Sequence, residues 1–100
     1  MNRRVEAKIN WLTEGQGGRK EIPYGDKYAP IIKLTKPLFE SDDFWSVFVI
    51  NKTMISQNET ISCLYYLSDM APDNLWEGVE FMLCEGPKTV ARGVVLREVV

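Results

Sequence analysis

The spacing of apolar residues constrains the fold of this chain more than any other feature of the sequence. In residues 5–11, apolar side chains alternate with Glu6, Lys8 and Asn10, a period of two that is typical of a β-strand with one buried face. No segment shows the period of about 3.6 residues that marks an amphipathic helix. The pattern therefore predicts an all-β protein.

Five further segments have the length and composition of strands. They are rich in β-branched and aromatic residues and are bounded by residues that favour turns. We predict strands at residues 30–35, 44–50, 60–67, 79–83 and 89–99, with residues 51–58 as a polar connection. In residues 60–67 one face carries Ile61, Cys63, Tyr65 and Leu67. Six strands without a helix predict a closed barrel or a sandwich, since closure removes exposed sheet edges.

Two glycines shape the predicted C-terminal hairpin. Gly86 suits the first central position of a type II′ turn, and Pro87 is tolerated after it. Gly93 lies inside the last predicted strand. A glycine at such a position indicates a bulge, a bend or a close approach of another backbone.

Length and composition bound the class of protein. One hundred residues, of which 45% are hydrophobic and 26% charged, fit a single soluble globular domain. The chain lacks a run of about 20 apolar residues that could cross a membrane, and its first residues lack the apolar run of a signal peptide. We therefore expect a cytoplasmic protein, in which Cys63 and Cys84 are buried thiols rather than a disulfide.

The chemical inventory argues against catalysis. The chain has no histidine, which removes the commonest general base and the commonest metal ligand. No nucleophile stands beside an identifiable base, and no acidic pair has the pattern of a metal-binding loop. The phosphate-loop motif of GTPases is also missing. We expect no enzyme activity, metal, cofactor or GTP binding.

The net charge of −2 conceals an asymmetry. Residues 1–36 carry eight Lys/Arg against four Asp/Glu, a balance of +4, and residues 37–100 carry four against ten, a balance of −6. In the basic part, Gly15 to Lys20 has two interpretations. It forms a backbone nest that presents amides, with Arg19 and Lys20, to a phosphate, or it is a flexible connection with solvated side chains.

Aromatic and acidic residues elsewhere leave similar alternatives. Tyr24, Tyr28 and Trp11 flank the basic loop and either stack on nucleic-acid bases or fill the interior, which we expect for Trp11. The run from Asp69 to Glu85 contains no Lys or Arg. It faces either a basic partner or solvent.

Short motifs follow one another in a fixed order near both ends of the chain. Near the N-terminus they are Gly17-Gly18-Arg19, Pro23 and Tyr28-Ala29-Pro30. Near the C-terminus they are Leu75, Gly78, Phe81, Glu85-Gly86, Thr89-Val90 and Gly93-Val94-Val95. In order and spacing they resemble the C-terminal (third) β-barrel domain of bacterial translation elongation factor Tu, and the similarity spans most of residues 5–97.

The resemblance implies that residues 1–100 form one closed six-stranded antiparallel β-barrel of the elongation-factor C-terminal domain type. In that family the Gly-Gly-Arg and Glu-Gly loops touch the T-arm of aminoacyl-tRNA, and the matching positions here are Gly18, Arg19 and Gly86. Two arginines of the family pattern are replaced by Ala29 and Pro87. The resemblance therefore carries fewer phosphate contacts over to this chain.

The expected function is non-catalytic binding, by a stand-alone barrel that recognises a protein or an RNA partner. The residues expected to carry it are Gly18, Arg19, Lys20, Tyr24, Tyr28 and Gly86. Two alternatives stay open: a structural or assembly subunit that acts through self-association as a homo-oligomer, and an oligonucleotide-binding barrel.

Overall fold

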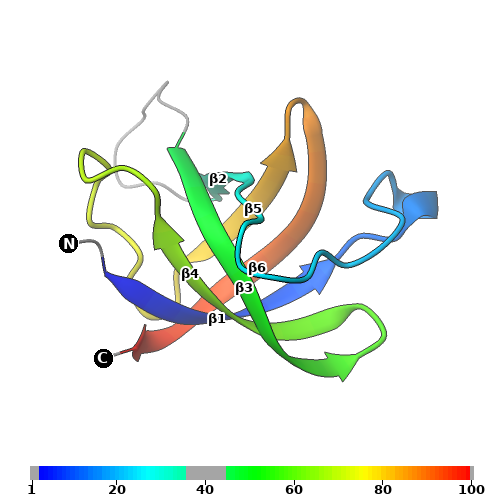
Figure 1. Ribbon diagram of the computed structural model, residues 1–100, viewed down its shortest axis with the longest axis horizontal. Helices are drawn as coiled ribbons and strands as arrows, with labels where there is room; N and C mark the ends of the chain where they lie inside the picture. Colours follow the sequence, from blue (N-terminus) through cyan, green and yellow to red (C-terminus); the bar gives the residue numbers. More distant parts are fainter. Residues whose placement is uncertain (1–2, 36–44, 100) are drawn as a thin grey trace.

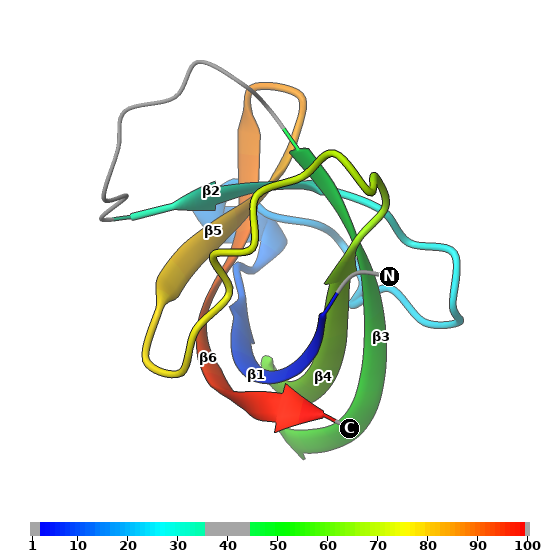
Figure 2. The same ribbon diagram turned by 90° about the vertical axis from the view of Figure 1, so that its left-hand side faces the viewer.

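The computed structural model describes residues 3–35 and 45–99, which form an all-β fold (Figure 1). The elements are β1 (Arg4–Trp11), the short 3-10 helix η1 (Glu14–Gln16), β2 (Ile31–Leu34), β3 (Trp45–Ser56), β4 (Glu59–Tyr66), β5 (Glu80–Glu85) and β6 (Lys88–Val99). The strands are antiparallel in the order β1-β4-β3-β2-β5-β6, and β6 pairs with β1, so the sheet closes in a ring (Figure 2). The predicted six-stranded antiparallel architecture is confirmed.

The prediction for residues 51–58 is wrong, because β3 continues as far as Ser56 and only Gln57 and Asn58 form the turn. Among the described residues, β3 pairs with β2 through Ser46 and Trp45, and the amides of Val47 and Val49 donate to the carbonyl oxygens of Pro30 and Tyr28 just before β2. Its pairing with β4 runs to the end of the strand. Within the part of the chain that the structure describes, residues 52–56 therefore pair with β4 alone and are exposed to solvent. Polar residues are accommodated there, and the period-two pattern is lost. Residue 44 of the predicted third strand lies outside the described residues.

The interior is lined by one face of each strand. On β1 the buried residues are Val5, Ala7, Ile9 and Trp11, as the alternation predicted. Directly opposite residues of paired strands share a face, and β1 faces Thr60, Ser62 and Leu64 of β4. The predicted face of Ile61 and Tyr65 is therefore the outer one, and Leu67 lies beyond the strand. Cys63 and Cys84 are free and buried, as expected.

A buried polar network explains why two hydroxyl side chains face the interior. Trp11 Nε1 donates to Thr60 Oγ1 (2.9 Å), and Thr60 and Ser62 both donate to Asn51 Oδ1 (3.2 and 2.5 Å). Asn51 Nδ2 donates to the carbonyl oxygen of Pro23 (2.5 Å). Buried hydroxyls are tolerated when their hydrogen bonds are satisfied. The network also fixes the loop between β1 and β2 to the wall of the ring.

Glycine sets the local geometry at both predicted positions. Gly86 has φ +60°, and Pro87 fixes the next φ at about −65°, which is the combination of a type II′ turn. At Gly93, an added Cβ would lie 2.5 Å from Cζ of Phe81 and 2.8 Å from the carbonyl oxygen of Lys8. Only glycine therefore allows the Phe81 ring and the β1 backbone to approach β6 this closely. The two register irregularities of β6 lie on either side of Gly93, at Val90 opposite β5 and between Val95 and Arg97 opposite β1.

Among the described residues, no helix has the length and apolar character needed to span a membrane.

The packing at Gly93 gives a prediction for stability. We expect Gly93→Ala to lower the free energy of unfolding by about 1–3 kcal/mol, because the methyl group forces the buried Phe81 ring or the β1 backbone to move. Gly15→Ala is the matched control, since its Cβ meets nothing closer than 3.9 Å, and it should change stability by less than about 0.5 kcal/mol. Urea denaturation followed by tryptophan fluorescence measures both values. Equal stability of the two variants would contradict the packing argument.

Candidate functional site

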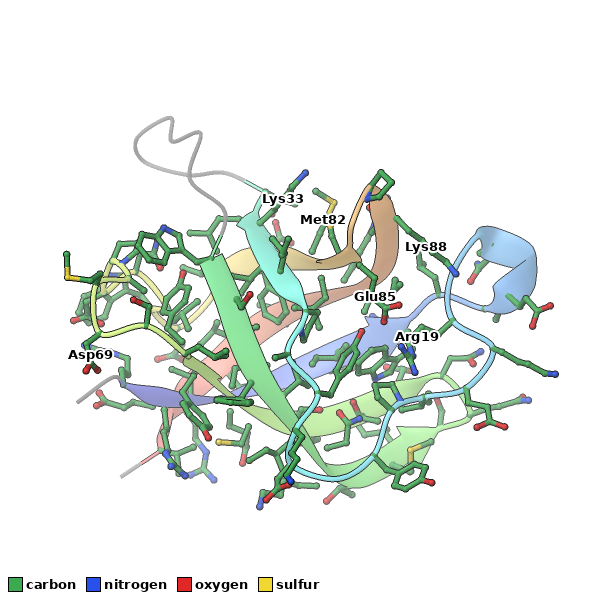
Figure 3. All side chains as sticks on the ribbon, turned by 45° about the horizontal axis from the view of Figure 1, so that its top comes forward. Arg19, Lys33, Asp69, Met82, Glu85 and Lys88 are labelled. Atoms are coloured by element: carbon green, nitrogen blue, oxygen red, sulfur yellow. The ribbon has the colours of Figure 1, made fainter. Side chains whose placement is uncertain are left out.

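The loops singled out by the resemblance meet at one end of the ring, where β1 ends and the β5–β6 hairpin turns (Figure 3). Arg19 comes from the β1–β2 loop and Glu85 from the last position of β5. Although they are 66 residues apart in the chain, Arg19 Nη1 donates to Glu85 Oε2 at 2.5 Å. Gly86 follows Glu85 directly, and Tyr28 also contacts Glu85, so three residues of the predicted site, Arg19, Tyr28 and Gly86, are brought to this end.

Glu85 is the centre of a cluster that it forms with Arg19 and Tyr28. We call the end of the ring that carries this cluster the Arg19–Glu85 end. The Tyr28 hydroxyl donates to the same oxygen, Glu85 Oε2, at 2.5 Å. The Arg19 guanidinium also lies over the Tyr28 ring, 5.0 Å from its centroid, and Arg19 Nε donates to the carbonyl oxygen of Glu21 (3.1 Å). The Tyr28 ring in turn packs 6.0 Å from that of Trp11. The cluster is thus anchored on the buried core.

These contacts shift the titration of all three groups. Burial tends to raise the pKa of Glu85, but the hydrogen bonds from Tyr28 and Arg19 outweigh it and hold this pKa below its usual value. Burial and the neighbouring carboxylate raise the pKa of Tyr28, so its hydroxyl remains a donor. The hydrogen bond to Glu85 also raises the pKa of Arg19. At neutral pH the charge of Arg19 is therefore balanced by Glu85.

The glycine-rich turn before Arg19 uses its amides internally. The amides of Gln16 and Gly18 donate to the carbonyl oxygen of Thr13 (2.9 and 2.8 Å), and the amide of Gly17 donates to that of Glu14 (3.1 Å). Gly17 has φ +88°, which glycine adopts without strain. An anion nest needs amides that point outward, so these three amides do not form the nest considered from the sequence.

The remaining predicted residues differ in what they can contact. Gly18 is buried, and it has no room for a side chain, since an added Cβ would lie 2.1 Å from the carbonyl oxygen of Leu12. Lys20 is exposed, and it lines a cleft with Arg19 beside the β3–β4 turn. Tyr24 is 89% exposed, whereas Tyr28 is partly buried and engaged with Glu85. Of the two tyrosines, only Tyr24 is open to a partner over most of its surface.

Glu85 was not among the predicted site residues, although it belongs to the Glu85-Gly86 motif. The signal that could have paired the two residues is the presence of an acidic residue in one loop motif and an arginine in the other. That signal becomes specific only once the topology brings the two loops together.

The described residues contain no group of three or more His, Cys, Asp or Glu side chains that could hold a metal ion. No protein-family model matches the chain, and no curated protein matches it.

The lowered pKa of Glu85 predicts a pH dependence of stability. Its contribution is complete above the unfolded-state pKa of about 4.3 and is lost as the pH falls through the lower folded-state pKa. We expect Glu85→Gln to be less stable than the wild type near about pH 6, and to lose less stability than the wild type on acidification to about pH 2.5. Urea denaturation across this range measures the difference.

A second variant tests the cause of that shift. Tyr28→Phe removes one of the two donors to Glu85 and leaves Arg19 in place, so its loss of stability on acidification should lie between those of the wild type and Glu85→Gln. If all three proteins lose the same stability between the two pH values, the cluster does not control the titration of Glu85.

Proposed function

We propose that this protein is a non-catalytic cytoplasmic binding module, an elongation-factor-type barrel without GTPase activity that recognises a protein or an RNA partner. The observation that carries the proposal is the hydrogen-bonded ion pair between Arg19 and Glu85. It joins the Gly-Gly-Arg loop to the Glu-Gly loop, and the counterparts of these loops in elongation factor Tu, which the chain resembles, contact tRNA. The closed ring of six antiparallel strands also supports the proposal of an elongation-factor-type barrel.

Charge at the Arg19–Glu85 end favours a protein partner over RNA. Arg19 is paired with Glu85, and the exposed groups of the β1–β2 loop are of both signs: Glu14, Lys20, Glu21, Asp26 and Lys27. Affinity for phosphates depends on an excess of Lys and Arg. A mixed-charge surface with a protruding aromatic residue, Tyr24, is instead typical of protein interfaces, where tyrosine supplies much of the contact energy.

The assembly alternative is favoured by a separate observation on β3. Met54 and Ile55, in its second half, are 56% and 50% exposed. Residues 52–56 pair with β4 but not with β2 among the described residues. An open strand edge with apolar side chains can add a strand from a second copy. Sedimentation velocity over a concentration series tests this role, and a strict monomer at high concentration would exclude it.

A charge reversal that leaves the ion pair intact tests the binding function. We expect Lys20→Glu combined with Lys27→Glu, two exposed lysines of the β1–β2 loop, to reduce recovery of the specific partner in affinity capture from cell lysate by at least about fivefold, because charges around an interface steer and select its partner. Quantitative mass spectrometry and RNA sequencing of the captured material measure the effect. Arg19 is left unchanged, since its replacement by Glu would place two carboxylates together.

The matched control reverses Lys33 and Arg92 to Glu, two exposed charges on β2 and β6. These residues flank Met82 of β5 on the wall of the ring. Partner recovery should stay at the wild-type level. Recovery of no specific protein or RNA, or the same loss in both double variants, would reject the proposal. RNA recovered in a salt-sensitive manner would favour the oligonucleotide-binding alternative.

A further inference from the structure

The other end of the ring, where β1 begins and β6 ends, presents a surface of different composition. In Figure 3, Asp69 marks this end, away from Arg19, Glu85 and Lys88. Three large apolar side chains of the β4–β5 loop are exposed there: Leu67 (43%), Met70 (83%) and Trp76 (50%). Exposed apolar side chains that gather in one loop mark a contact surface more often than isolated ones do.

The same loop is strongly acidic. Residues 67–80 contain four Asp or Glu and no Lys or Arg. Asp69 and Glu77 are exposed, and neither forms a hydrogen bond or an ion pair with any residue that the structure describes. We call Leu67, Asp69, Met70, Asp73, Trp76, Glu77 and Glu98 the acidic surface. Its carboxylates repel nucleic acids and anionic membranes, so a basic partner complements it.

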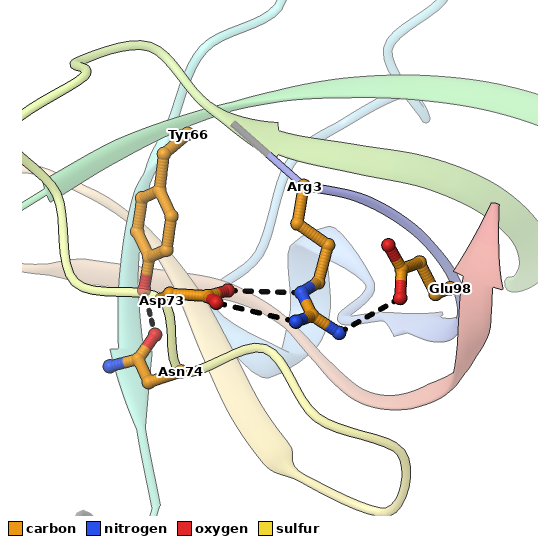
Figure 4. A network of polar contacts seen from close by, with 5 residues as sticks. All are labelled: Arg3, Tyr66, Asp73, Asn74 and Glu98. Atoms are coloured by element: carbon orange, nitrogen blue, oxygen red, sulfur yellow. Dashed lines mark hydrogen bonds and ion pairs between the residues drawn. The ribbon is translucent and has the colours of Figure 1, made fainter. Parts of the chain in front are cut away.

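Arg3 shows how a guanidinium is held at this surface (Figure 4). Its Nε and Nη2 donate to the two oxygens of Asp73 (2.9 and 3.3 Å), and its Nη1 donates to Glu98 (3.0 Å). The guanidinium also lies 3.9 Å from the ring centroid of Trp76. A planar cation that pairs with a carboxylate on its edge and stacks on an indole is the arrangement that arginine makes better than lysine.

Arg3 covers only part of the carboxylates and of the indole ring that it contacts. The side chains of Asp73 and Glu98 are still 63% and 54% exposed, and Trp76 keeps half of its surface open. A cleft of about 420 Å³ adjoins the ion pair and is lined by Arg3, Tyr66, Asp69, Asp73, Leu75 and Glu98. This volume admits one large side chain of a partner. The carboxylates of the acidic surface outnumber the single cation Arg3, so the surface keeps a net negative charge.

We propose that the acidic surface docks a basic segment of a partner protein that carries arginine next to an apolar residue. The arginine binds the free carboxylates of Asp69 and Glu77 or the open lone pairs of Asp73. The apolar residue packs on Met70 and Trp76. This surface lies opposite the Arg19–Glu85 end, so the proposal does not depend on the function proposed for that end.

Peptides of defined composition test the chemistry directly. The probe is a fluorescein-labelled peptide of about ten residues that alternates arginine and leucine. Comparison peptides replace arginine by lysine or glutamate, or leucine by serine. Fluorescence anisotropy measures binding to the full chain. We expect the arginine–leucine peptide to bind most tightly and to weaken as salt is raised, since exposed charges are screened.

The variant Asp69→Asn, Met70→Ser, Glu77→Gln removes two carboxylates and one apolar side chain from exposed positions and leaves the contacts of Arg3 intact. We expect it to bind the arginine–leucine peptide about tenfold more weakly than the wild type. The matched control, Glu21→Gln, Tyr24→Ser, Asp26→Asn, makes the same kind of change at the opposite end and should bind like the wild type. Thermal melting by circular dichroism confirms that both variants fold.

Several outcomes would overturn the proposal. They are equal binding of the arginine–leucine and glutamate–leucine peptides, no preference for arginine over lysine, and an equal effect of the two triple variants. If the wild type self-associates in sedimentation and the Asp69 variant does not, the surface belongs to a contact between two copies. The Lys20→Glu, Lys27→Glu variant should bind the peptide at least as tightly as the wild type, which separates this test from that of the Arg19–Glu85 end.

Discussion

The pairing of β1 with both β4 and β6 is the constraint on which the rest of this structure depends. It leaves neither β1 nor β6 with an open edge along the ring, and it encloses the interior between them. It also gives the molecule two distinct ends, because β1 runs from Arg4 at one of them to Trp11 at the other. The loops that carry charged and aromatic residues are held at these ends. A sheet that stayed open would lose both surfaces together with its core.

Each end is crossed by an ion pair between residues far apart in the chain: Arg19 with Glu85, and Arg3 with Asp73 and Glu98. All of these side chains are partly exposed, and pairs of this kind contribute only about 0–1 kcal/mol to stability. Their main effect is on position, since they hold loop side chains in one arrangement. In both places the arginine also lies against an aromatic ring, Tyr28 or Trp76. The two ends share this construction but differ in charge, mixed at one and acidic at the other.

Local periodicity predicted most of the fold, because a strand with one buried face has to alternate. It failed where burial depends on partners distant in the sequence. Among the described residues, Lys52 to Ser56 of β3 pair with β4 alone and face solvent, so nothing imposes alternation on them. Thr60 and Ser62 face the interior because Trp11 and Asn51 satisfy their hydroxyls, and this cannot be read from β4 alone. The family resemblance selected Arg19 and the hairpin of Gly86, but only the closed topology pairs Arg19 with Glu85.

The two buried cysteines allow local opening of the ring to be measured. Cys63 of β4 and Cys84 of β5 are 9% and 4% exposed, and they belong to strands on different sides of the ring. A thiol reagent reaches such groups only when the surrounding structure opens locally. Their alkylation rates under native conditions therefore report separately how often each part of the wall opens. The chain thus carries two native thiols that report on local opening of the ring, and no label has to be introduced.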